Sequence, residues 1–172
     1  MRLRGAVVVL LSLPLAACGA DGVADSAPPP SRAEVAVQVA GLWKRVSPAA
    51  RKAAPCVGRA VSRSFSAEQL RAAGILDAEY VAARRLPVLQ AGVARGWVKA
   101  WFGCVDVIAV TARAQAKDTP GLDVPGFERC VRTRITRRQL RAAAMDGLTG
   151  RENSRAVAGV STVLFRCARQ HR

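Results

Sequence analysis

The residues of this sequence with the most evident chemistry are its five cysteines, Cys18, Cys56, Cys104, Cys130 and Cys167. A structural zinc site takes pairs of ligands separated by two to four residues, and a dithiol redox motif has the spacing C-x-x-C. The gaps between the last four cysteines contain 47, 25 and 36 residues. We therefore expect neither a metal site nor dithiol redox chemistry.

Residues for acid, base or nucleophilic catalysis are sparse. The only histidine is His171, one residue from the C-terminus, where chains usually fray. Serine-hydrolase, phosphate-loop, zinc-protease and EF-hand strings are absent from the sequence. Four acids that could serve a glycosidase are scattered along the chain: Asp77, Glu79, Asp106 and Asp146. We predict no catalytic residue and no cofactor, and the protein is not expected to be an enzyme.

A cluster of arginines is the candidate binding surface. Six of them occur between residues 129 and 141, and on a helix Arg137, Arg138 and Arg141 would share one side. Such a side could bind an anionic lipid or an anionic wall polymer; no specific nucleic acid is expected. The alternative is a solvated face that keeps the domain soluble.

Two tryptophans support a second binding hypothesis. Trp97 and Trp101 are one helical turn apart and could line a pocket for a lipid or a small apolar ligand. On this hypothesis the protein is a carrier of that ligand. The alternative is that both side chains belong to the apolar core.

The N-terminus has the pattern of a secretory signal peptide. Arg2 and Arg4 precede an apolar run that ends at Pro14, and small residues follow. The run is shorter than the roughly 20 apolar residues that a transmembrane helix needs. We therefore expect residues 1–17 to be removed.

The end of this signal is Leu15-Ala16-Ala17-Cys18. It resembles the bacterial lipoprotein signal, in which an aliphatic residue and two small residues precede a cysteine. The resemblance covers only the first 18 residues. It implies cleavage before Cys18, attachment of lipid including palmitate to its thiol, and anchoring to the outer face of the cell membrane. The alternative is ordinary cleavage a few residues further on, which would discard Cys18.

Lipidation of Cys18 would explain the odd number of cysteines. It leaves an even set of four, and in an oxidising extracytoplasmic compartment we expect these to form two disulfides. Three pairings of four cysteines exist.

The composition of the mature chain predicts one all-α domain. Removal of residues 1–17 leaves 155 residues, and 25 basic less 12 acidic residues gives a charge of +13. Alanine, arginine and leucine favour helix, and no clean period-two run occurs. Residues 18–32, with three consecutive prolines, should form a disordered tether with a reach of about 20 Å. Ser31 and Glu34 form a capping-box pattern that begins the helical domain, residues 33–172.

An internal repeat divides this domain into two related units, about 48–104 and 124–170. Each unit has a cysteine, a Ser/Thr-x-x-Gln cap and the string Gln-Leu-Arg-Ala-Ala, at Gln69 and at Gln139. In the first unit Asp77 is expected to cap a further short helix. A helix over 105–117 should connect the units, which are expected to share one core. The repeat favours pairing Cys56 with Cys104 and Cys130 with Cys167.

The layout of four cysteines and two Ser/Thr-x-x-Gln-Leu strings is similar to small secreted actinobacterial helical proteins of unknown function. This resemblance implies no activity. The sequence therefore predicts a lipid-anchored extracytoplasmic protein that acts as a binding or interaction module at the cell envelope.

Overall fold

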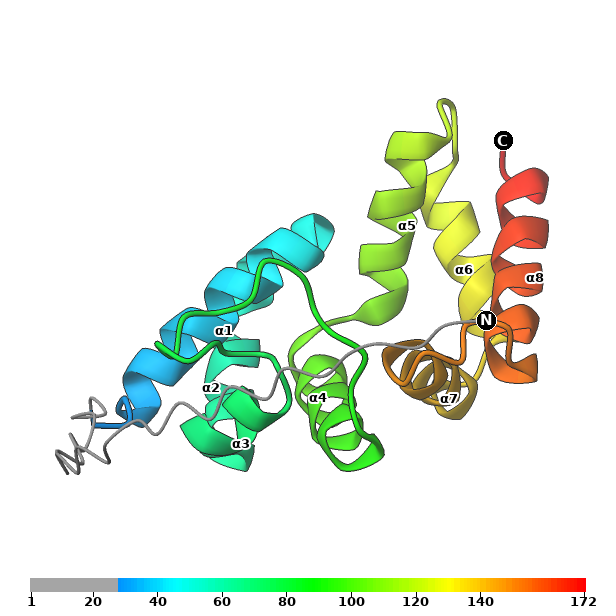
Figure 1. Cartoon of the computed structure of the whole chain (residues 1–172). Helices are drawn as coiled ribbons and strands as arrows, with labels where there is room; N and C mark the ends of the chain where they lie inside the picture. The colour runs from blue at the N-terminus through cyan, green and yellow to red at the C-terminus, as the bar shows by residue number, and fades with distance from the viewer. Residues whose placement is uncertain (1–27) are drawn as a thin grey trace, which may run out of the picture.

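The computed structural model of the chain describes residues 28–172. The expected signal peptide, Cys18 and the first part of the expected tether lie outside the described residues. The described part is helical, with an isolated bridge between Leu76 and Ala82 and no strand. The all-α prediction is therefore confirmed. The helices, shown in Figure 1, are α1 (Arg32–Val46), the 3-10 helix η1 (Pro48–Ala53), α2 (Ala54–Ser64), α3 (Ala67–Ala72), α4 (Ala91–Cys104), α5 (Val107–Asp118), α6 (Val124–Arg134), α7 (Arg137–Leu148) and α8 (Arg155–Gln170).

Reciprocal capping boxes begin three of these helices. Ser31 caps α1, Ser66 caps α3 and Thr136 caps α7. In each, the hydroxyl accepts a hydrogen bond from the backbone N–H three residues on, and the Glu or Gln there accepts one from the cap residue's N–H. These reciprocal bonds satisfy amides that a helix leaves without intrahelical partners. The capping boxes predicted from the sequence are confirmed.

Close packing of α1 on α2 depends on a glycine. A Cβ atom at Gly58 would lie 2.2 Å from the carbonyl oxygen of Ala36 and 3.2 Å from the Cβ of Ala40. The apolar side of α1 is buried against α2, with Val39 and Leu42 both 0% exposed. The two helices can approach this closely because Gly58 has no side chain.

The chain between α3 and α4 contradicts the prediction of a further short helix capped by Asp77. Asp77 Oδ1 instead accepts hydrogen bonds from the amides of Glu79 and Val81, and such local bonds compete with helix formation. The segment lies along α1, where Gln38 accepts from the amide of Ala82. Figure 1 shows it as the green loop in front of α1.

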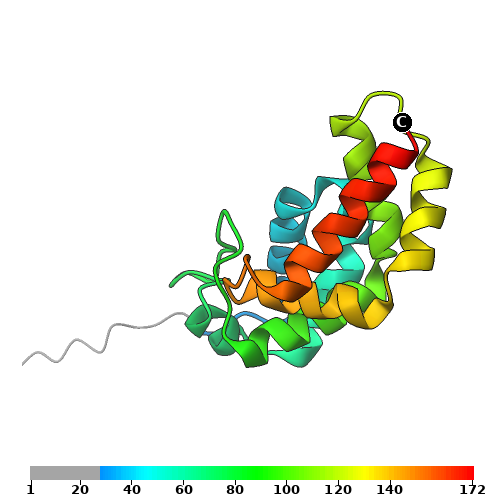
Figure 2. The ribbon, with the colours of Figure 1, turned by 90° about the vertical axis from the view of Figure 1, so that its right-hand side faces the viewer.

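Two hydrophobic clusters are present, so the expectation of one shared core is wrong. The first lies among α1, α2, α3, α4 and the loop before α4, and the second among α5, α6 and α8. Helix α7 contributes to both, because Met145 and Leu148 pack on the first cluster and Leu140 on the second. In Figure 2, α7 (orange) runs across the base of α6 and α8. Helix α5 also contacts both clusters, because Val110 packs on the first cluster whereas Ile108 and Ala112 belong to the second.

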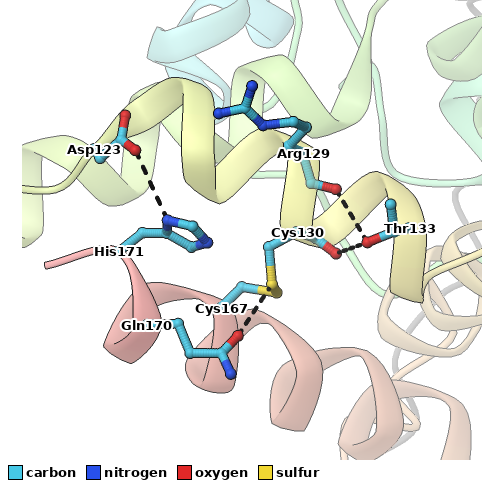
Figure 3. Close-up of a disulfide and its surroundings, with 7 residues drawn as sticks. All are labelled: Asp123, Arg129, Cys130, Thr133, Cys167, Gln170 and His171. Atoms are coloured by element: carbon cyan, nitrogen blue, oxygen red, sulfur yellow. Dashed lines mark hydrogen bonds and ion pairs between the residues drawn. A yellow bond between two sulfur atoms is a disulfide. The ribbon is translucent and has the colours of Figure 1, made fainter.

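The disulfides join Cys56 to Cys104 and Cys130 to Cys167, which confirms the predicted pairing. Each links the helix that opens a unit to the helix that closes it, α2 to α4 and α6 to α8. The Cα–Cα distance is 5.7 Å in both. In Figure 3, Gln170 Oε1 lies 3.5 Å from Cys130 Sγ. This is a packing contact, since a disulfide sulfur has no proton to donate.

Substitution Gly58→Ala should destabilise the protein by about 1–3 kcal/mol, the usual cost of overpacking, because the new methyl group meets the carbonyl of Ala36. The control is Gly159→Ala on α8, where an added Cβ would have no neighbour within 4 Å. That variant should be neutral or more stable by up to about 1 kcal/mol. Urea unfolding measures both; equal effects of the two substitutions would contradict the close helix approach.

Candidate functional site

The three arginines predicted to bind an anion have unequal environments. The Arg137 guanidinium donates a hydrogen bond to the carbonyl oxygen of Phe102. The Arg141 guanidinium carbon lies 5.6 Å from the centroid of the Phe102 ring, a cation–π distance. Arg138 is exposed. Two of the three therefore hold α7 against α4, and anion binding by this set stays a prediction.

Arg132 of the same cluster forms ion pairs. Its guanidinium lies 2.6 Å from Asp106 and 3.5 Å from Glu128. Asp106 also caps α5 by accepting from the amide of Ala109. Partial burial would raise the pKa of Asp106, but the hydrogen bonds from Arg132 and Ala109 and the charge of Arg132 outweigh it, so its pKa is lowered. Asp106 is therefore ionised at neutral pH, and the positive charge of Arg132 balances its negative charge.

The two tryptophans of the carrier hypothesis pack in the first cluster. Trp97 is 1% exposed, and its ring centroid lies 6.4 Å from that of Trp43. Trp101 lies edge-on to Trp43 at 5.7 Å. The pockets of residues 28–172 that we describe are lined by other side chains. Both residues contribute to core packing, and the carrier hypothesis stays a prediction.

The candidate site is a cleft between η1 and α5, which we call the inter-unit cleft. It has a volume of about 760 Å³. Arg51 and Lys52 line the η1 side, and Arg113 and Lys117 line the α5 side. Its floor is largely apolar and includes Val105, Val110 and the Cys104 end of the first disulfide. The cleft therefore presents four cations from two helices around an apolar floor.

The charges of this cleft are poorly compensated. Its four cations are exposed, and none takes part in the ion pairs found within residues 28–172. Asp106 is the only carboxylate in the lining, and Arg132 already neutralises it. A cleft lined by charges of one sign concentrates the field and attracts ions of the opposite sign. Four cations around an apolar floor suit the binding of an anion.

A smaller pocket continues this surface beyond the corner between α4 and α5. It has a volume of about 300 Å³ and shares Val105 and Asp106 with the inter-unit cleft, and it adds Arg132 and Arg137. Part of the arginine cluster predicted from the sequence therefore borders the candidate site. The sequence reasoning missed the main cations because η1 and α5 are far apart in the chain. The only local signal was the spacing of Arg113 and Lys117, which are four residues apart.

His171 is held in place rather than frayed. The amide of Asp123 donates to the carbonyl oxygen of His171 at 2.7 Å, and His171 Nδ1 lies 3.7 Å from Asp123 Oδ2. Figure 3 shows this pair beside the second disulfide. The expectation of a frayed C-terminus is wrong because this hydrogen bond ties the end of α8 to the start of α6.

Substitution Asp106→Asn tests the ion pair between Asp106 and Arg132. Asparagine retains a capping oxygen but loses the charge, so stability at pH 7 should fall by about 0.5 kcal/mol, as for an exposed ion pair. Because the folded pKa of Asp106 is lowered, its contribution is present above the unfolded value of about 3.9. It is lost as the pH falls through the folded value. Urea unfolding at pH 7 and at pH 2 should show a difference from wild type at pH 7 only; a difference that persists at pH 2 would contradict this account.

Comparisons with protein-family models, curated proteins and solved structures gave no match. Among the described residues, no helix is both long and apolar enough to cross a membrane. No group of three or more His, Cys, Asp or Glu side chains in residues 28–172 could hold a metal ion.

Proposed function

We propose that this chain is an extracytoplasmic lipoprotein, anchored to the cell membrane through Cys18, that binds an anionic polymer of the cell envelope in the inter-unit cleft. The single observation that carries the binding proposal is the set of four uncompensated cations on two facing helices. The anchor rests on Leu15-Ala16-Ala17-Cys18 in the sequence.

The disulfides support the extracytoplasmic location. Disulfides persist in oxidising compartments and are rare in the cytosol. Both disulfides join helices within one unit and leave Cys18 as the one cysteine outside these pairs. That is the arrangement expected if Cys18 carries a lipid.

A polymer suits the cleft better than a single small anion. The four cations are long, exposed side chains without fixed partners, so they do not converge on one preformed point. They lie on two sides of an open cleft, where repeated negative charges along a chain could contact several of them in turn. Such contacts have little geometric specificity and depend strongly on salt.

Replacement of Arg51, Lys52, Arg113 and Lys117 by glutamine should weaken binding of a polyanion about tenfold or more, a loss of at least about 1.4 kcal/mol. The measurement is calorimetric titration of the mature lipidated protein, in neutral detergent, with inorganic polyphosphate. The loss should shrink as salt is raised, because exposed charges are screened.

The matched control replaces four exposed arginines that do not line the inter-unit cleft: Arg84, Arg85, Arg155 and Arg166. It removes the same charge and should leave most of the affinity intact. Equal losses in the two variants would show that binding reflects overall charge, and the cleft proposal would then be wrong.

Substitution Cys18→Ala tests the anchor separately. The variant has no thiol to accept a lipid, so a high-salt wash, which screens electrostatic contacts, should release it from the membrane fraction with both disulfides intact. Cell fractionation and peptide mapping without reduction measure the two results. A variant that stays in the membrane fraction after this wash would contradict the proposed anchor.

A further inference from the structure

A second surface, outside the inter-unit cleft, lies on the exposed side of α1 and α2. It is a groove of about 650 Å³, which we call the α1–α2 groove. Its floor consists of alanines, a glycine, a proline, Val37 and one polar residue, Ser62, and its rim carries the cations Arg32, Lys44, Arg59 and Arg63. Charge at the edge and apolar groups at the centre are the chemistry of a surface that meets lipid headgroups.

Val37 shows that the floor faces outward. Its neighbours on the buried side of α1, Val35 and Val39, are 2% and 0% exposed, whereas Val37 is 70% exposed. The groove is shallow and open because α2 approaches α1 closely at Gly58. It therefore offers an apolar surface rather than an enclosed pocket for a small ligand.

The charge around the groove has one sign. Residues 32–64 contain seven Lys or Arg and one acid, Glu34, a net charge of +6. The Glu34 carboxylate is engaged at the start of α1, where it accepts from the amide of Ser31 at 2.7 Å. No carboxylate belongs to the groove lining. Membranes that carry anionic lipids attract such basic surfaces within about a Debye length.

The position of the groove in the chain places it near the proposed anchor. Arg32, at one end of the groove, is the first residue of α1. The described chain begins at residue 28, ten residues after Cys18. Ten residues span at most about 35 Å even when fully extended. If Cys18 is lipidated, as the proposed function holds, the groove stays within reach of the headgroups.

We propose that the α1–α2 groove is the face with which this protein docks on an anionic phospholipid surface. Arg32, Lys44, Arg59 and Arg63 contact the headgroups, and Val37 enters the interfacial region. The lipid anchor keeps the protein close to the membrane, and the groove determines which face of the protein contacts it.

The chain contains its own reporters for this docking. Its four lysines are Lys44, Lys52, Lys99 and Lys117. Lys44 is on the groove rim, Lys99 is exposed on α4, and Lys117 lines the inter-unit cleft. The rate at which an amine-reactive reagent acylates each lysine can be followed by peptide mass spectrometry.

The experiment places the mature lipidated protein in nanodiscs of phosphatidylcholine alone or of phosphatidylcholine with phosphatidylglycerol. We expect acylation of Lys44 to slow several-fold on the anionic discs, with the rates of Lys99 and Lys117 unchanged. Val37→Asp places a carboxylate on the groove floor and should restore the Lys44 rate to that on neutral discs. The control Val88→Asp alters a valine of similar exposure, 72%, outside the groove and should leave Lys44 protected.

Equal Lys44 rates on the two discs, or the same rates in the Val37 and Val88 variants, would overturn the docking proposal. Failure of the proposed function has different signatures. If added polyphosphate does not slow acylation of Lys117, which lines the inter-unit cleft, binding in that cleft is contradicted, whereas the Lys44 result on the two discs is unaffected. If mass spectrometry finds no lipid on Cys18, the Lys44 measurement is made with anionic vesicles in excess; protection would then retain the docking face, and its absence would refute it.

Discussion

The disulfide between the opening and closing helices of each unit is the constraint on which this structure depends. The second hydrophobic cluster has only seven buried residues, and two of these are Cys130 and Cys167 themselves. The sequence separations of the linked cysteines are 48 and 37 residues. In the chain-entropy account, closing loops of this length in the unfolded chain contributes about 4 kcal/mol per disulfide. Net stabilities of domains are about 5–15 kcal/mol, so covalent links can stabilise a unit whose apolar core is small.

With two separate clusters, the relation between the units depends on a few contacts. Phe102 is 4% exposed yet belongs to neither cluster; Trp101 packs on it at 5.4 Å, and Arg137 and Arg141 of α7 contact it from the other unit. A backbone hydrogen bond from Leu89 to Leu148 adds a second link at 2.7 Å. These contacts hold α7 against the first unit. Val110 of α5 also packs on the first cluster, and the inter-unit cleft lies beside this contact, between η1 and α5.

The positive charge of the protein is divided between structural and exposed positions. Arg45 donates to backbone carbonyls of the loop before α4, Arg132 bridges α5 and α6, and Arg137 and Arg141 join the units. The cations of the inter-unit cleft and of the α1–α2 groove have no such partners among the ion pairs described. Net charge alone indicates that the protein attracts anions. Only the division between structural and exposed cations indicates which surfaces attract them. Both proposals therefore rest on the exposed set.

The sequence by itself determined the features that depend on short-range chemistry. Capping boxes at Ser31, Ser66 and Thr136 need only residues three apart, and helix propensity is likewise local, so the all-α class and most helix starts could be predicted. The disulfide pairing could be predicted because the repeat places the cysteines at corresponding positions. Only the tertiary structure decided the loop at Asp77, where side-chain bonds to nearby amides and contacts with α1 replace the predicted helix. It also decided the separation of the two cores and the inter-unit cleft, whose facing Arg51 and Arg113 are 62 residues apart in the sequence. No local pattern encodes that approach, because it results from the packing of α5 and α7 against the first cluster.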